Sequence, residues 1–208
     1  MINELICRYP VLKACEKEIT NAKNILIDCF KNGNKLLLCG NGGSCADCDH
    51  IVGELMKGFL LKRPIGEEKK AEMKKNSPTL DENTVEKLQS ALPAISLPAF
   101  SALNTAFCND VDAELLYAQA LYGLAKEGDV LLAISTSGNS KNVLQCAKVA
   151  RAVGVRIIAL TGETGGALRA LADTCICAPE HETYKIQELH LPIYHTLCAE
   201  IEKTFFAE

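Results

Sequence analysis

The feature that most constrains this chain is a short apolar run that ends in a glycine-rich turn. Leu36 to Cys39 form the run, and the turn that follows consists of Gly40, Asn41, Gly42, Gly43 and Ser44. A run of this length is typical of a strand buried on both faces of a parallel sheet. Glycines let the backbone approach a ligand, and Ser44 is expected to cap the next helix. The stretch from Lys35 to Phe59 therefore predicts strand, turn and helix, with a phosphate seat at the turn.

A second apolar run ends in a turn rich in hydroxyl groups. Val130 to Ile134 form the run, a helix is expected from Lys141 to Val153, and the hydroxyls between them belong to Ser135, Thr136, Ser137 and Ser140. Hydroxyls and free backbone N–H groups at a helix N-terminus favour an anion. The alternative is a simple helix cap, but a cap rarely needs four hydroxyls in six residues. This turn is the better candidate for a phosphate site.

Apolar runs alternate with helical patterns along the rest of the chain. Further strands are expected at 92–97, 155–160 and 174–178, and helices at 11–31, 44–60, 111–126 and 184–206. This alternation predicts an α/β three-layer sandwich with a five-stranded parallel sheet, flanked by the N- and C-terminal helices. Ligands of such sheets bind at the carboxyl ends of the strands, where both polar turns lie.

Length and charge restrict the class of protein. The 208 residues suggest one domain, and the net charge of −4 argues against a nucleic-acid surface, which needs clustered Lys and Arg. Residues 1–10 have no signal-peptide pattern and no run approaches the length of a membrane span, so we expect a cytoplasmic protein without a membrane partner.

The eleven cysteines mostly fall within apolar patterns, and their number is odd. Buried, reduced thiols are the expected state. Cys45 and Cys48 form a C-x-x-C pair at a helix start, which leaves a metal or redox role open, although a zinc ribbon would need a second such pair.

The segment at about 61–90 differs from the rest in composition. It is dense in Lys and Glu and contains Pro64 and Pro78, which is typical of a solvated excursion from the core. We expect a mobile loop or exposed helix in its first half and a second short helix within 81–91. Its acidic residues interleave with the basic ones, which argues against a polyanion site.

Two helices carry polar side chains at functional spacings. His50 and Glu54 are four residues apart, so they share a helix face and can meet one substrate or one metal ion. Gln187 and His195 lie eight apart on the last helix, about 80° from each other around its axis, so we expect them to converge on a single site. A histidine in a buried helix is more often a core residue than a ligand, so this second pair has a structural alternative.

Taken together, the motifs resemble a known family. CGNGGS followed by HIVGEL, then CND, GDVLLAISTSGNSKNV, ALTGETGG and IQELHLPIYH are similar to the bacterial sedoheptulose 7-phosphate isomerases, the phosphoheptose isomerases of the sugar isomerase (SIS) domain superfamily. The match covers nearly the whole chain except the charged insertion, which is longer than the family norm. It implies a single SIS domain over 1–208 with a flavodoxin-like sheet.

The resemblance also implies an activity, a cofactor and an assembly. The expected reaction converts D-sedoheptulose 7-phosphate to D-glycero-D-manno-heptose 7-phosphate through an enediol, with Glu54 and His195 as acid and base. One zinc ion per subunit would be bound by His50, Glu54, Gln187 and His195. The family is homotetrameric, with active sites between subunits. A regulatory SIS protein of the replication-initiator-binding type and an isomerase of another ketose phosphate are the alternatives.

The resemblance assigns the remaining site residues to the sugar phosphate. Those that would contact the sugar or its phosphate are Asn41, Gly42, Gly43, Ser44, Glu54, Asn109, Asp110, Ser135, Thr136, Ser137, Ser140 and Gln187.

Overall fold

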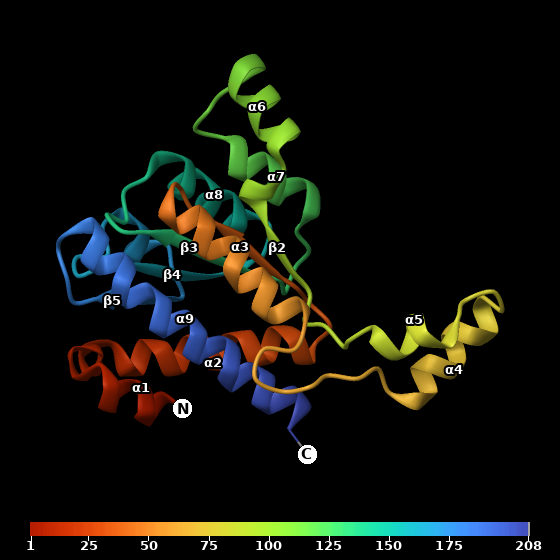
Figure 1. Ribbon diagram of the computed structural model, residues 1–208. Coiled ribbons are helices and arrows are strands. Elements are labelled where there is room, and N and C mark those ends of the chain that lie inside the picture. The colour runs from red at the N-terminus through yellow and green to blue at the C-terminus, as the bar shows by residue number, and fades with distance from the viewer. Residues whose placement is uncertain (208) are drawn as a thin grey trace.

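A computed structural model describes residues 1–207, and its centre is a parallel sheet of five strands (Figure 1). The strands are β1 (Leu36–Cys39), β2 (Ala94–Ser96), β3 (Val130–Ser135), β4 (Arg156–Gly162) and β5 (Thr174–Ala178), in the order β2-β1-β3-β4-β5. The order reverses between β1 and β3, so these two strands flank the topological switch point of the sheet. The predicted parallel sheet and all five of its strands are confirmed.

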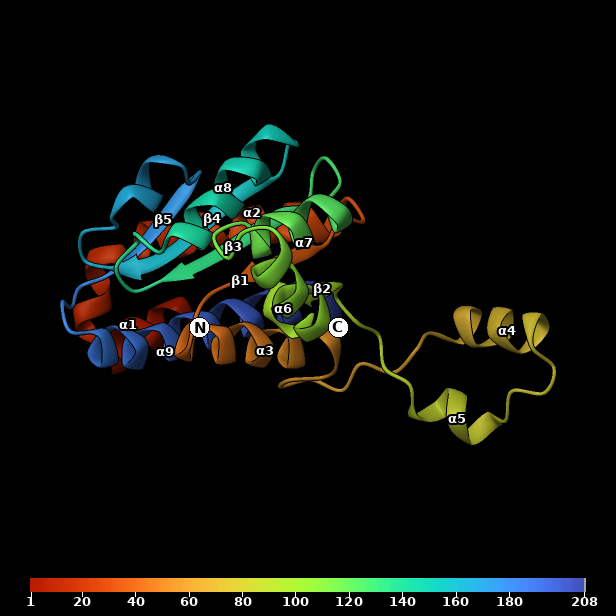
Figure 2. The ribbon, with the colours of Figure 1, turned by 90° about the horizontal axis from the view of Figure 1, so that it is seen from above.

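Helices cover both faces of the sheet (Figures 1 and 2). One layer contains α1 (Ile2–Arg8), the 3₁₀ helix η1 (Pro10–Cys15), α2 (Glu16–Lys31), α3 (Gly43–Met56) and α9 (Thr183–Phe206). The other contains α7 (Leu116–Leu124), α8 (Lys141–Ala152) and the 3₁₀ helix η3 (Ala167–Ala170). Side chains of a strand point alternately to the two faces, so Leu38 joins the first core and Leu37 the second. The three-layer sandwich is therefore as predicted.

Some predicted helix ends differ from those observed. The helix expected from residue 11 begins as the 3₁₀ helix η1, with Pro10 as its first residue. Ser44 does not cap α3: Gly42 is the capping position, and Ser44 lies buried in the first turn. The helix expected over 111–126 begins only at Leu116, as α7, and Asp110 ends a separate helix, α6 (Ser101–Asp110), which follows the 3₁₀ helix η2 (Leu97–Ala99).

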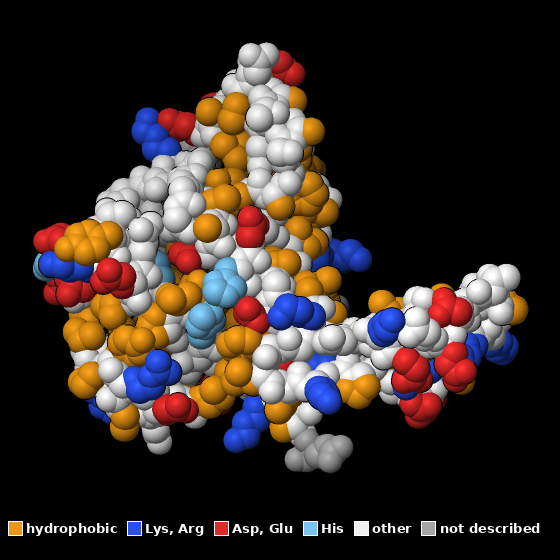
Figure 3. Space-filling model, in the orientation of Figure 1, with side chains coloured by type: hydrophobic (Ala, Val, Ile, Leu, Met, Phe, Trp, Pro, Cys, Tyr) orange, Lys and Arg blue, Asp and Glu red, His pale blue; other side chains and the backbone are white. Residues whose placement is uncertain are grey.

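The charged segment forms an arm of two helices, α4 (Glu67–Asn76) and α5 (Glu82–Lys87), which projects from the sandwich (Figures 1 and 2). The Lys70 ammonium joins them, because it contacts Glu67 of α4 and Glu86 of α5, each at 2.8 Å. Side chains of both charge signs cover the arm (Figure 3). The expected exposed helices are thus present.

We expect limited proteolysis of the purified protein to cut first within residues 65–88. The arm buries few apolar side chains, so little burial offsets the entropy of ordering it. Mass spectrometry of the first fragments produced by trypsin and by a glutamyl endopeptidase measures this. Earlier cleavage in the sandwich, with the arm intact, would show instead that another surface covers the arm.

Within residues 1–207, no helix combines the length and the apolar character that crossing a membrane requires.

Candidate active site

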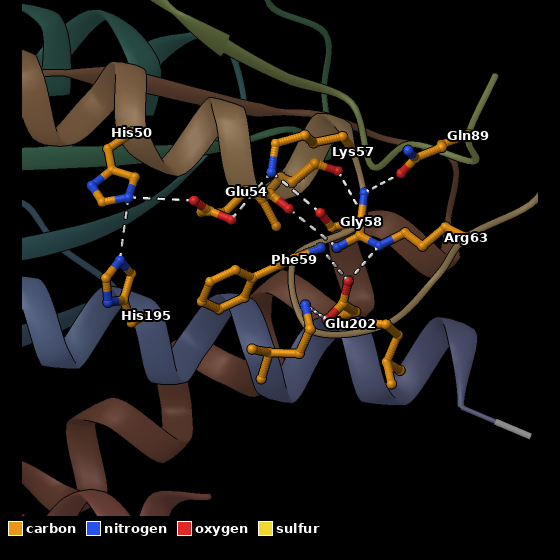
Figure 4. Close-up of polar contacts among 12 residues, drawn as sticks. His50, Glu54, Lys57, Gly58, Phe59, Arg63, Gln89, His195 and Glu202 are labelled. Carbon is orange, nitrogen blue, oxygen red and sulfur yellow. Dashed lines mark hydrogen bonds and ion pairs between the residues drawn. The ribbon is translucent and has the colours of Figure 1, made fainter. Parts of the chain in front are cut away.

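The expected acid–base residues meet where α3 packs against α9 (Figure 4). His50 Nε2 lies 3.3 Å from Glu54 Oε1, one turn later on α3, and 3.3 Å from His195 Nε2 on α9. Figure 3 shows histidine side chains gathered on this face of the molecule, bordered by hydrophobic and acidic ones. The sequence spacing that predicted a shared face on α3 is confirmed.

The other nitrogen of His50 is oriented by a tyrosine. The Tyr194 hydroxyl donates to Asp47 Oδ1 at 3.1 Å and lies 3.0 Å from His50 Nδ1. Since the hydroxyl proton is directed to Asp47, the hydroxyl oxygen can accept the proton on Nδ1 of His50. This contact fixes the orientation of the His50 ring and directs its Nε2 toward Glu54 and His195.

His195 lies in an environment that favours its neutral form. Burial lowers the pKa of His195, and the neighbouring His50 lowers it further. The negative charge of Glu54 raises this pKa but does not offset the other two effects. The Phe59 ring packs against the imidazole with centroids 5.5 Å apart, and a cavity of about 400 Å³ beside both side chains opens between α1 and α9. A neutral imidazole next to a cavity can accept or donate a proton near pH 7.

One carboxylate oxygen of Glu54 has no hydrogen-bond partner in the part of the chain that the structure describes. Its side chain is 14% exposed, and its Oε2 is buried without a hydrogen-bond partner among residues 1–207. Lys57 Nζ is 3.8 Å from that oxygen, a distance that attracts the carboxylate without forming a hydrogen bond. A buried, unsatisfied carboxylate oxygen is costly, which indicates that it serves a proton, a substrate or a cation.

The spacing of these groups is compatible in part with a metal ion. Two ligand atoms around a tetrahedral Zn²⁺ lie about 3.3 Å apart when each bond is about 2.0–2.1 Å. His50 Nε2 has this separation from both Glu54 Oε1 and His195 Nε2. As positioned, however, no group of three or more His, Cys, Asp and Glu side chains within residues 1–207 surrounds one point as a metal site does. The donor types and pairwise distances fit zinc, but the ligand set is not closed.

Gln187 lies at the opposite end of the contact between the two helices. Its side chain covers the first turn of α3, because a Cβ placed on Gly43 would be only 2.6 Å from Gln187 Nε2. Eight residues separate Gln187 from His195, which is about 12 Å along the helix axis. The structure brings His50, Glu54 and His195 together and directs Gln187 toward the glycine turn.

The two polar turns are joined by a pair of amides. Asn41 Nδ2 donates to Asn142 Oδ1, and Asn142 Nδ2 donates to Asn41 Oδ1, both at 2.9 Å. The Tyr117 hydroxyl donates to the carbonyl of Gly40 at 2.8 Å. The turn after β1 and the start of α8 therefore form one surface at the switch point of the sheet.

The hydroxyl turn after β3 is held in place from within. Ser135 Oγ and Ser140 Oγ are 3.0 Å apart, and Ser137 Oγ accepts the N–H of Asn139. Gly138 has a φ of +64°, and a Cβ there would lie 2.1 Å from the carbonyl oxygen of Gly165, so the turn packs directly on the loop after β4. The hydroxyls are thus preorganised next to the N-terminus of α8.

Comparisons with known proteins agree with this geometry. The SIS domain family model matches residues 8–97 and 82–162. A phosphoheptose isomerase from Nitratiruptor sp. is 38% identical over 187 residues, which cover 90% of this chain and 86% of the relative. One from Aneurinibacillus thermoaerophilus is 36% identical over 202 residues, 97% of this chain and 87% of the relative.

A solved structure of a phosphoheptose isomerase from Francisella tularensis superposes with a TM-score of 0.77 at 30% identity, covering 94% of this chain and 91% of that one. This chain belongs to the phosphoheptose isomerase family of SIS-domain proteins. Family membership makes it an isomerase by class, and the predicted resemblance is confirmed.

Two residues expected to contact the sugar lie apart from the cluster of His50, Glu54 and His195 in this chain. Asn109 and Asp110 end α6, where the Asn109 amide donates to the Asp110 carboxylate at 2.8 Å and both side chains are exposed. Helix α6 contains no buried residue and stands away from α9 (Figure 1). Among residues 1–207, no hydrogen bond or ion pair joins this pair to His50, Glu54 or His195.

Six of the eleven cysteines are buried, as expected, but Cys7 and Cys108 are exposed. Cys48 is buried and Cys45 is half-buried.

Several residues of this isomerase site carried no motif in the sequence. Tyr194 and Asp47 orient His50, Phe59 packs on His195, and Asn142 bridges the turns. Asp47 stands three residues before His50, and this one-turn spacing is the only local signal that could have identified it.

Proposed function

We propose that this protein interconverts D-sedoheptulose 7-phosphate and D-glycero-D-manno-heptose 7-phosphate. The observation that carries the proposal is the contact of His50 with both Glu54 and His195. Family membership supplies the substrate class, and this cluster supplies groups for proton transfer.

The reaction moves a proton from C1 to C2 of the ketose through an enediol. Glu54 is the proposed base at carbon, because its Oε2 has no competing hydrogen bond. His195 is the proposed carrier of the hydroxyl proton between O1 and O2, because its lowered pKa keeps it neutral and able to exchange a proton. Neither group is consumed, since each returns its proton when the aldose forms.

The phosphate would be held at the hydroxyl turn by Ser135, Thr136, Ser137 and Ser140, near the N-terminus of α8. Asn41, Gly42, Gly43 and Ser44 would line the sugar. Seven residues of α3 separate Gly43 from His50, about 10 Å along the axis, so binding at the turns can orient the far end of a linear sugar toward the cluster.

Zinc is part of the proposal, with His50, Glu54 and His195 as ligands. Gln187, the fourth expected ligand, lies toward the glycine turn in this chain and is not among the clustered donors. When bound, zinc would supply Lewis-acid polarisation of the sugar carbonyl. We also propose a cytoplasmic homotetramer. Leu103 of α6, Val111 directly after it and Tyr122 of α7 are 39%, 63% and 68% exposed, which supports burial of this region against other copies.

Incubation of the purified protein with sedoheptulose 7-phosphate, followed by NMR of the sugar, tests the proposal. We expect an aldose signal and incorporation of solvent deuterium at the carbon that receives the proton. Fructose 6-phosphate serves as the comparison ketose. Conversion of that sugar alone would move the assignment to another ketose phosphate, and conversion of neither would reject it.

The phosphate seat makes a separate prediction. Ser137→Ala with Ser140→Ala should raise KM about tenfold or more, because hydrogen bonds to a charged group are each worth about 1.5–3 kcal/mol. Steady-state kinetics measures the change, and Ser77→Ala on the arm is the control. An unchanged KM would place the phosphate elsewhere.

A further inference from the structure

A buried ion pair joins the two helices that carry the proposed acid–base groups. Arg63 follows α3, and Glu202 lies about two turns after His195 on α9. Their side chains are 0% and 1% exposed, and Arg63 Nε donates to Glu202 Oε1 at 2.7 Å (Figure 4). Buried charges are costly unless they are paired and fully hydrogen-bonded, so the remaining contacts of this pair indicate what it holds in place.

The Glu202 carboxylate holds the segment that leaves α3. It accepts the backbone N–H groups of Phe59, Leu60 and Leu61 at 2.8, 2.7 and 3.1 Å (Figure 4). Burial alone would raise the pKa of Glu202, but these donors and Arg63 lower it below its ordinary value. Three consecutive N–H groups on one ionised carboxylate fix the path of this segment.

The Arg63 guanidinium holds the end of α3 itself. Its Nη1 donates to the carbonyl of Leu55 at 2.8 Å and its Nη2 to the carbonyl of Glu54 at 3.1 Å. Carbonyls in the last turn of a helix lack partners within the helix, so they need such donors. Arg63 therefore fixes the backbone of the residue whose carboxylate is the proposed base.

Phe59 connects this network to His195. Its N–H group is bound by Glu202, and its ring packs on the imidazole with centroids 5.5 Å apart and an interplanar angle of 39°. Release of the segment would move the ring and admit water to His195. One network thus controls the backbone at Glu54 and the packing at His195.

We propose that Arg63 and Glu202 are positioning residues for the isomerisation, which set Glu54 and Phe59 against His195 without touching the sugar. The inference rests on the proposed function of the cluster. It differs from a purely structural role, since a structural pair would affect folding stability alone.

The chain offers a matched control outside α3 and α9. The Asp129 carboxylate is also 1% exposed, and it accepts the N–H groups of Lys35 and Lys126 at 3.0 and 2.7 Å and the Lys35 ammonium at 2.6 Å. It stands immediately before β3, and within residues 1–207 its side chain bonds only Lys35 and Lys126, neither of which belongs to α3 or α9. Neutralising either carboxylate should lower the folding stability, but only the neutralisation of Glu202 should lower kcat.

The first experiment compares Glu202→Gln with Asp129→Asn, using sedoheptulose 7-phosphate well below both melting temperatures. Glu202→Gln should lower kcat by tens of fold, up to about 100-fold, since small displacements of reacting groups have effects of this size. Its KM should change little, because the phosphate turn is remote from the pair. Asp129→Asn should keep the wild-type kcat. A wild-type kcat in Glu202→Gln, or an equal loss in both variants, overturns the proposal.

A second readout does not depend on turnover. The chain has four histidines, so NMR with labelled histidine resolves them, and His195→Gln assigns the resonance of interest. Movement of the Phe59 ring should shift the His195 ring signals in Glu202→Gln but not in Asp129→Asn. Unshifted His195 signals in Glu202→Gln overturn the proposal. A wild-type protein without isomerase activity would reject the proposed function, while this measurement would still test the positioning.

Should Glu202→Gln not fold, Arg63→Lys takes its place in both experiments. Lysine keeps the charge opposite Glu202 but lacks the forked donors that reach both carbonyls of α3. The same loss of kcat and the same shift at His195 are expected. Wild-type values for both in a folded Arg63→Lys protein overturn the role of Arg63.

Discussion

Replacement of Glu54 by glutamine is expected to lower kcat by about 100- to 10,000-fold, the range that a positioned general base contributes. Glutamine keeps the size of the side chain but cannot take a proton from C1. The phosphate turn and the fold do not depend on this carboxylate, so substrate binding should persist. Exchange of the C1 proton with deuterated solvent measures the step directly, apart from product release.

The control for this variant is Glu200→Gln. Glu200 also lies on the layer that contains the site, and its side chain is 20% exposed, close to the 14% of Glu54, but it contacts the N-terminal amino group. It should keep full exchange activity. Undiminished exchange in Glu54→Gln would remove Glu54 as the base.

Substitution of either clustered histidine is expected to remove bound zinc. We expect wild-type protein to contain about one zinc per chain, and His50→Ala and His195→Ala each to lose most of it. Each substitution removes one of three clustered donors, and zinc sites need three or four protein ligands. Elemental analysis after dialysis measures the content without any assay of activity.

His181→Ala is the matched control for the zinc experiment, because His181 is exposed and its imidazole contacts Glu163 at 2.6 Å, away from α3. Equal zinc in wild type and in both site variants would place the metal on cysteines or outside this site. If zinc leaves the variants but chelated wild type keeps its turnover, the ion is structural, and Glu54 and His195 perform the chemistry without it.

The sheet was predictable because its strands are buried on both faces. Runs such as Leu36 to Cys39 and Val130 to Ile134 have no polar alternation, and each ends in a turn that only glycine or small polar residues tolerate. Their order along the chain fixes parallel pairing through helical crossovers. Burial on both faces requires an unbroken apolar run, and such a run can be recognised from the sequence alone.

Elements without a buried face were missed for the same reason. Helix α6 buries none of its residues, and α1 buries only Leu5, so neither produces an apolar stripe that periodicity can detect. The prediction that a helix begins just after Asp110 was wrong, because the one apolar pattern present belongs to α7.

The acid–base cluster was partly predictable. Spacing alone placed His50 and Glu54 on one face, but the approach of His195 depends on how α9 packs across α3, which local sequence does not encode. The contact between Arg63 and Glu202 could not be predicted from the sequence, because the two residues are 139 positions apart. Backbone N–H groups, the main ligands of Glu202, have no sequence signature at all.

The arm leaves and re-enters the domain at one point. The Ser90 N–H donates to the Arg63 carbonyl at 2.7 Å, and Pro64 pairs with Gln89 in an antiparallel bridge. When the two ends of a segment are already held together, its length can change at small entropic cost. A single genetic insertion could therefore have introduced the arm without shifting the register of the sheet. For the same reason, residues 65–88 are a natural position to graft an epitope or a fluorescent reporter onto this enzyme, provided that Gln89 and its bond to Gly58 are retained.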